Sequence, residues 1–163
     1  MNDQTKSFAV AAEQLFDGEK VLTDHAVLVD KGAVVSVVPE NEVPAGVPVL
    51  KEPDTTIIPG LIDSHIHFMQ WEGPLYLAYG VNTVRDVGNE LAWILKQRAE
   101  GEKSLSPTIL CVGPLIEGPH ACHQVISRVC ASEADAASAV RDLAYAGVDG
   151  IKLYVGLPAA WLG

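Results

Sequence analysis

The chain has 163 residues, of which 48% are apolar and 20% charged, and its formal net charge is −10. This acidic balance excludes a protein that binds nucleic acid through the phosphates, and it argues against an anionic membrane surface as a partner. No uninterrupted apolar stretch reaches the roughly 18 residues of a membrane span, and no apolar signal core follows the polar first residues. We therefore expect a folded cytoplasmic protein.

The cysteine content favours the same compartment. The three cysteines, Cys111, Cys122 and Cys130, do not form the even set that is typical of a disulfide-stapled secreted domain. Reduced thiols in a cytosolic protein fit this pattern better. Cys111 lies in an apolar run, and we expect it in the core because free cysteine is among the most buried residue types.

Residues 1–55 read as short β-strands. Residues 8–16 are mostly apolar, and two β-branched runs, 26–29 and 33–38, flank Asp30-Lys31-Gly32, which predicts a tight hairpin turn. The proline-rich stretch 39–53 is expected to be a loop, with a short strand at 47–50 within it. These strands are too few to close a sandwich by themselves.

Residues 56–163 show buried strands that alternate with helices. Four apolar stretches predict strands, at 56–67, 81–87, 108–112 and 150–155. Two helices are predicted between them, at 90–100 with Asn89 as N-cap and at 133–146 with Ser132 as N-cap and Gly147 as the stop. This order predicts a parallel sheet with helices on its outer face. We expect that the sequence ends within such a repeating unit; a small natural four-strand protein is the alternative.

The strongest chemical signal is the segment Pro-Gly-Leu-Ile-Asp-Ser-His-Ile-His at residues 59–67. Residues i and i+2 of a strand point to the same face, so His65 and His67 should project together at the end of the predicted strand. Two neutral imidazoles at this spacing can bind one borderline metal ion such as zinc. They can also be ordinary polar residues, but the preceding apolar strand, the Pro-Gly break and Asp63 favour a metal site.

Residues 59–67 resemble the first-strand signature of the amidohydrolase superfamily, which comprises metal-dependent hydrolases on a TIM barrel. The segment Gly-Val-Asn-Thr-Val-Arg-Asp-Val-Gly at 80–88 is similar to the second strand of that family. Residues 1–55 resemble the N-terminal half of the β-sandwich that precedes the barrel in the dihydroorotase, imidazolonepropionase and prolidase-like branches. The implied fold is α/β, with roughly four strands of a (β/α)8 barrel after half of a small β-sandwich, or about half of a complete member.

The segment 147–154 matches a third element of the family. The fourth strand of many members carries a lysine that is carboxylated by CO₂ and bridges two metal ions, and the resemblance implies this role for Lys152. His65 and His67 would then hold the first of one or two divalent ions, with Zn²⁺ the expected metal. Burial lowers the pKa of a lysine and so supplies the neutral amine that CO₂ needs. The alternative is an ordinary lysine whose amine reaches solvent at a strand end.

The segment 113–123 follows the third predicted strand, on the side where barrel active sites form. Its resemblance to the prolidase-like and imidazolonepropionase-like branches implies that His120 and His123 line a substrate pocket. A separate zinc site that also uses Cys122 would lack a fourth ligand. A plain surface loop is the remaining interpretation.

Three further residues near the motif have two possible roles. Arg85 could hold a substrate carboxylate through its planar fork, or it could pair with Asp63 or Asp86 as scaffolding, which we favour. Trp71 and Tyr76 could form a wall of the pocket, although core packing is the expected role.

The resemblance implies metal-assisted hydrolysis of an amide or cyclic amide C–N bond in a small molecule or dipeptide, and the Pro119-His120 segment favours the prolidase-like side. The family takes further ligands, and the aspartate that acts as general base, from later strands that this sequence does not contain. The catalytic residue is therefore unknown, and we expect the chain alone to be inactive. The competing interpretation is a truncated or split fragment that at most binds metal. Open sheet edges favour association, so a homo-oligomer is possible.

Overall fold

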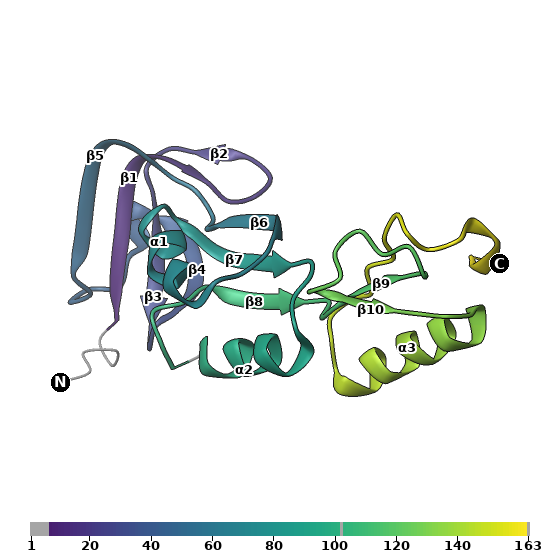
Figure 1. Cartoon of the computed structure of the whole chain (residues 1–163). Helices are drawn as coiled ribbons and strands as arrows, with labels where there is room; N and C mark the ends of the chain where they lie inside the picture. The colour runs from purple at the N-terminus through teal and green to yellow at the C-terminus, as the bar shows by residue number, and fades with distance from the viewer. Residues whose placement is uncertain (1–6, 102, 163) are drawn as a thin grey trace. The chain divides into compact units, whose positions relative to one another are not determined.

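The computed structural model describes residues 7–101 and 103–162, which form two compact units, Met1–Pro59 and Gly60–Gly163 (Figure 1). The first unit is built around a five-stranded sheet with the order β2-β1-β3-β4, in which β5 also pairs with β1. Its elements are β1 (Phe8–Phe16), β2 (Val21–Leu22), β3 (His25–Asp30), β4 (Ala33–Pro39), η1 (Glu40–Glu42) and β5 (Val49–Ile57). None of the helices in the described residues is long and apolar enough to cross a membrane.

The predicted hairpin between β3 and β4 is confirmed. The two strands are antiparallel, and Asp30 pairs with Ala33 across the turn. Lys31 and Gly32 at the turn have positive φ angles of 49° and 79°. Two central residues with positive φ give the turn a twist that matches the right-handed twist of the flanking strands.

The short strand predicted at 47–50 within the loop-like stretch 39–53 exists but is longer than predicted, because β5 begins at Val49, continues to Ile57 and runs parallel to β1. The strand contains Pro53, which cannot donate a hydrogen bond to the ladder. The pairing register shifts between Ala12 and Gln14, and Asp54 has a φ of 58°. This irregularity accommodates the proline, which strands tolerate at bulges.

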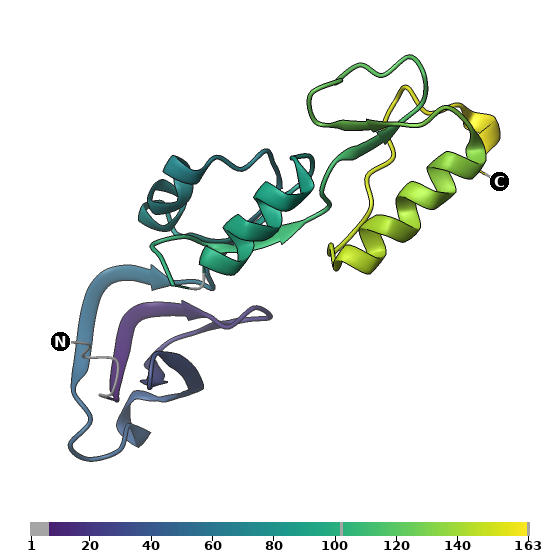
Figure 2. The same cartoon turned by 60° about the horizontal axis from the view of Figure 1, so that its bottom comes forward.

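The second unit begins with a three-stranded parallel sheet in the order β6-β7-β8. Two helical segments connect β6 to β7 and one helix connects β7 to β8. The elements are β6 (Leu61–Ile66), η2 (Gln70–Glu72), α1 (Gly73–Ala78), β7 (Val81–Asp86), α2 (Leu91–Gly101) and β8 (Thr108–Cys111). The helices α1 and α2 lie on the same side of this sheet (Figure 2). Both contribute side chains to one core cluster.

Alternation along these strands leaves the other face of the sheet free. Val84 and Ile109 are buried in the core, whereas their neighbours Arg85 and Leu110 are exposed. Cys111 is fully buried in the same core, as predicted. The free face is therefore available to carry a site.

The rest of the second unit comprises β9 (Leu115–Glu117), β10 (Ser127–Val129), α3 (Glu133–Ala146) and η3 (Ala159–Trp161). The predicted strand at 150–155 does not form as a regular strand, because it makes a single parallel bridge between Ile116 and Leu153. Gly113, with a φ of 69°, and the following proline separate β9 from β8. The segment 150–155 consequently has β9 as its partner, a strand of only three residues.

The caps of the helices follow the sequence in one case and not in the other. Around α3, Ser132 Oγ accepts a hydrogen bond from the Asp135 amide at 3.2 Å, and Gly147 ends the helix with a φ of 81°, both as predicted. At α2, the prediction that Asn89 caps the helix is wrong. The Glu90 carboxylate accepts the first amides instead, because the Asn89 side chain binds Asp86.

Candidate metal and substrate site

A cavity of about 410 Å³ lies on the free face of the β6-β7-β8 sheet. It combines basic side chains and a histidine with aliphatic side chains, and its lining residues are His65, Arg85, Val87, Leu110, Val112, Asp149, Gly150, Ile151 and Lys152. Residues distant in the sequence thus meet at the ends of the strands. Three of the residues singled out in the sequence, His65, Arg85 and Lys152, lie in this one cavity, whereas His67, His120 and His123 are not among its lining residues.

His65 and His67 are neighbours at the carboxyl end of β6. Their ring centroids are 6.2 Å apart, and the ring planes are inclined by 69°. Both residues are exposed. The His65 amide donates to Asp63 Oδ1 at 3.2 Å, which fixes the backbone just ahead of the pair.

The ring of His67 has a defined tautomer in its neutral form. Its Nδ1 lies 2.8 Å from the carbonyl oxygen of Gly88. A carbonyl oxygen only accepts hydrogen bonds, so Nδ1 must carry the proton. The lone pair is left on Nε2, and this arrangement is the one that metal-binding histidines use.

The two histidines fit a metal ion as a partial ligand set. Within residues 7–101 and 103–162, no group of three or more His, Cys, Asp or Glu side chains could hold an ion. Lys152 would add an oxygen ligand only in the carboxylated form. Its Nζ lies 5.3 Å from the centroid of the Tyr154 ring, in a cation–π contact.

Tyr154 connects Lys152 with the 113–123 segment, and sequence reasoning missed it. The rings of His123 and Tyr154 are 5.2 Å apart and inclined by 46°. Contacts through Tyr154 therefore link His123 to Lys152, which lines the cavity. The signal that could have identified Tyr154 is its i+2 spacing from Lys152, which places both side chains on one face of an extended segment.

Glu117 organises the loop that carries His120 and His123. This residue is fully buried, and its carboxylate accepts the Ser127 hydroxyl at 2.6 Å and the backbone amides of Cys122, His123 and Gly156 at 3.1, 3.2 and 3.3 Å. Burial raises the pKa of Glu117, but these hydrogen bonds outweigh it and hold the pKa below its ordinary value. The separate zinc site of His120, Cys122 and His123 is not formed in the part of the chain that the structure describes.

Arg85 is held by the backbone. Its Nε donates to the Ser64 carbonyl oxygen at 2.8 Å. Within the part of the chain that the structure describes, Arg85 forms no ion pair with Asp63 or Asp86. The predicted pairing of Arg85 with a carboxylate is thus wrong, because the partner of its Nε is a carbonyl group. The remaining N–H groups of the guanidinium are not used by that bond.

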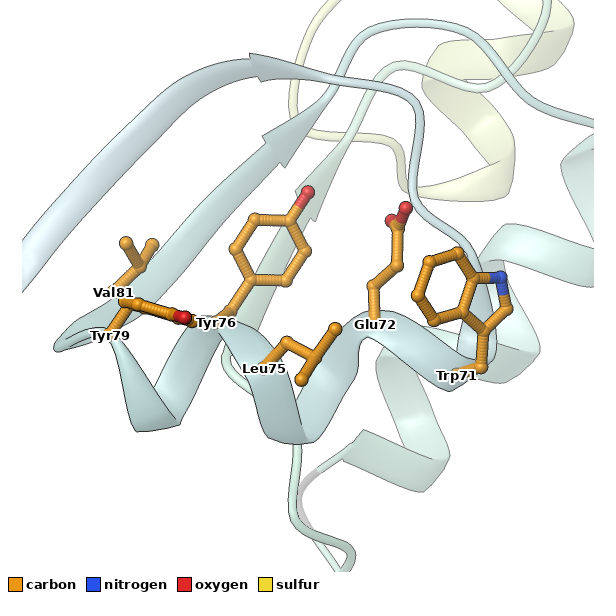
Figure 3. Close-up of a pocket in the computed structure, with 6 residues that line it drawn as sticks. All are labelled: Trp71, Glu72, Leu75, Tyr76, Tyr79 and Val81. Carbon is orange, nitrogen blue, oxygen red and sulfur yellow. The ribbon is translucent and has the colours of Figure 1, made fainter.

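A second cavity, of about 350 Å³, lies beside α1 and is lined by Trp71, Glu72, Leu75, Tyr76, Tyr79 and Val81 (Figure 3). The core role expected for Tyr76 is confirmed, since its ring stacks on Phe68 with the centroids 6.4 Å apart. The same expectation is wrong for Trp71, which is 66% exposed because it belongs to the short η2 turn. Burial, and then the charge of Glu72, raise the pKa of Tyr76.

The parallel sheet with its helices packed on one face resembles the first strands and helices of a (β/α)8 barrel. A His-x-His pair lies at the end of its first strand, and a small β unit comes before it in the sequence. Residues 8–51 match the family model of the NagA composite domain. A comparison with curated protein sequences finds no match.

Solved structures share the fold of the chain. A protein from Bifidobacterium longum assigned as a prolidase has a TM-score of 0.77 and 26% identity over 91% of this chain and 40% of its own. The A. niger ochratoxinase has a TM-score of 0.74 and 16% identity over 93% and 47%. A Xaa-Pro dipeptidase with bound methionine in its active site has a TM-score of 0.73 and 19% identity over 91% and 47%.

These matches confirm the resemblance of the chain to the amidohydrolase superfamily and its α/β fold class. The chain spans less than half the length of each of these three structures. These three structures are described as a prolidase, an ochratoxinase and a Xaa-Pro dipeptidase.

Proposed function

We propose that the chain supplies the first metal ligands of an amidohydrolase-type site that hydrolyses an amide C–N bond in a small molecule. The observation that carries this proposal is the His65–His67 pair, in which His67 presents Nε2 because Nδ1 is bound to Gly88. The names of the similar structures support a hydrolase of the prolidase or amidohydrolase type.

In this proposal His65 and His67 would hold Zn²⁺, and Lys152 in its carboxylated form would add an oxygen ligand. When bound, such an ion polarises the scissile carbonyl group and lowers the pKa of a water molecule. Arg85 orients an anionic part of the substrate with the N–H groups that Ser64 does not use. The aliphatic side chains of the cavity exclude water around it.

A dipeptide is the substrate class that we favour over a cyclic ureide or imidazolone. The cavity holds the guanidinium group of Arg85, and a free carboxylate at the end of a dipeptide would complement it. His120 and His123 would contact the rest of the substrate from the loop that Glu117 organises. We propose a cytoplasmic protein with a small-molecule substrate, without nucleic-acid or membrane partners, that self-associates.

A second candidate function is a metal-binding chain without activity. The specific observation in its favour is that the described residues gather no third His, Cys, Asp or Glu around the His65–His67 pair. A two-histidine pair should bind zinc more weakly than a four-ligand structural site. Both candidates therefore require zinc bound to this pair, and they differ in turnover.

The zinc content of dialysed protein tests the shared requirement. We expect zinc in the wild-type chain and its loss in the His65→Ala/His67→Ala double variant. His25→Ala is the matched control, because His25 is a histidine of the other unit whose Nδ1 bonds to Thr23. Equal zinc in the wild type and the double variant, measured by atomic emission, would refute the proposal.

A further inference from the structure

We infer that Asp86 is a positioning residue for His67: its carboxylate holds both the backbone that carries His67 and the carbonyl group that orients the His67 ring. The inference deepens the proposed metal site and therefore rests on the proposed function. Asp86 is the last residue of β7, is fully buried and does not line the cavity. It would act through His67 and not by contact with the ion or the substrate.

The backbone on both sides of His67 is bound to the end of β7. Before it, the Ile66 carbonyl oxygen accepts the Val87 amide at 2.9 Å. After it, the Phe68 amide donates to Asp86 Oδ2 at 2.8 Å. The second bond extends the β6–β7 ladder by a side chain at the point where β6 has ended, so Asp86 determines where the backbone places His67.

The same carboxylate orders the acceptor of the His67 ring. Asp86 Oδ1 accepts the Gly88 amide at 3.2 Å, and the Gly88 carbonyl oxygen accepts His67 Nδ1 at 2.8 Å. Asn89 completes the arrangement, because its side-chain amide donates to Asp86 Oδ2 at 2.6 Å and to the Phe68 carbonyl oxygen at 3.2 Å. A carboxylate therefore reaches the imidazole through one peptide unit, which is a form of the outer-shell support that metal-binding histidines commonly have.

The fit around Gly88 is tight, and the His67 ring and Leu115 are its nearest neighbours. A Cβ atom at residue 88 would lie 3.0 Å from His67 Cε1 and 3.2 Å from Nδ1. The φ angle of Gly88 is not positive, so glycine is required here by the lack of space and not by the backbone conformation. We expect a shift of this peptide to move the ring, because the Gly88 carbonyl oxygen accepts His67 Nδ1.

Asp86→Asn is the direct test. Both carboxylate oxygens accept from N–H groups, so the amide that replaces them directs an NH₂ group at one of the donors. We expect zinc affinity to fall on the order of 10- to 100-fold. In the metal-free chain, ¹H–¹⁵N spectra of the imidazoles should show His67 as the Nδ1–H tautomer in the wild type and as a mixture in Asp86→Asn.

Glu117→Gln is the matched control, because Glu117 is also a fully buried carboxylate that accepts backbone amides but does not contact the β6 end. It should leave the His67 tautomer and the zinc affinity unchanged. If Asp86→Asn fails to fold by circular dichroism, Asn89→Ala removes only one donor to Asp86 and should shift the tautomer partly.

An unchanged His67 tautomer in the folded Asp86→Asn protein, or in Asn89→Ala where Asp86→Asn does not fold, would overturn the inference. The spectra of the metal-free chain need no zinc, so they separate this inference from the proposed function. A wild-type chain that binds no zinc would refute the proposed function, while the tautomer measurement would still decide the role of Asp86.

Discussion

The Nδ1 atom of His67 donates a hydrogen bond to the carbonyl oxygen of Gly88 over 2.8 Å, although the two residues are 21 positions apart in the sequence. One residue follows β6 directly and the other lies just after β7, so the parallel pairing of these strands brings them together. This contact selects the ring nitrogen that stays free. It is the structural basis of the predictions for the candidate metal site.

Gly88→Ala should displace the His67 ring, because the new Cβ atom would lie 3.0 Å from its Cε1 atom. We expect weaker zinc binding and a loss of stability of roughly 1–3 kcal/mol, as is usual for an overpacked site. Zinc titration and urea unfolding measure the two effects. Gly101→Ala is the matched control, since its Cβ would meet atoms only at 3.6 Å and beyond. Equal zinc affinity in the two variants would contradict the prediction.

Glu117→Gln should destabilise the second unit by about 1–3 kcal/mol at neutral pH, because a buried acceptor for four donors is impaired. The pKa of Glu117 is lowered in the folded state, so its stabilising effect is present above the ordinary carboxyl pKa of about 4.5 and is lost as the pH falls through the folded value. Urea unfolding at pH 7 and near pH 3 should show a difference between wild type and variant that shrinks in acid. The exposed Glu19→Gln variant serves as control, and an equal loss in both variants would disprove the claim.

The three thiols should differ in reactivity. Cys122 is exposed, whereas Cys111 and Cys130 are buried, so iodoacetamide should modify Cys122 first in the native chain. Mass spectrometry of the digested protein identifies the labelled residue. Rapid labelling of Cys111 under native conditions would show that its surroundings are open.

The pH dependence of stability should reflect Cys111. Burial raises the pKa of its thiol from 9.0 to about 11. A raised pKa means that the stabilising effect is complete below pH 9 and is lost as the pH rises toward 11. The free energy of unfolding should therefore fall more steeply with pH in the wild type than in Cys111→Ala over this interval. Parallel curves from urea titrations would contradict this assignment.

The 163-residue chain should show background hydrolysis of dipeptides and cyclic ureides with added zinc, manganese or cobalt, since the described residues offer a two-histidine pair without a third such ligand. A coupled or chromatographic assay of the products measures it. Metal-dependent turnover that His65→Ala abolishes would prove this expectation wrong and would require another base, for which Asp86 and His120 are the residues to test.

The chain should self-associate through exposed apolar strand surface. β4 is an edge strand of the first unit, and its Val34 and Val35 are 68% and 59% exposed. Val34→Lys should reduce the association constant in sedimentation equilibrium. Tyr145→Lys on the exposed surface of α3 is the control for added charge, because no strand edge is involved. Equal association of the two variants, or a monodisperse wild-type monomer, would refute this view.

Local features of the fold were predictable from the sequence alone. The turn at Lys31 and Gly32 and the caps of α3 at Ser132 and Gly147 depend on residues close to one another in the chain, so short motifs specify them. The His65-x-His67 pair is equally local, because strand alternation places both rings near each other. The burial of Cys111 followed from the apolar run around it.

Features that depend on distant pairing were decided only by the tertiary structure. Strand β5 forms around Pro53 because β1 offers a parallel partner with a register shift, which no local propensity predicts. The segment around Lys152 makes one bridge instead of a strand, since β9 is too short to extend the ladder. The Asp86 carboxylate reaches Phe68 and Gly88 only once β6 and β7 lie side by side. Residue types and local spacing therefore determined which groups are present, and non-local strand pairing decided which of them meet.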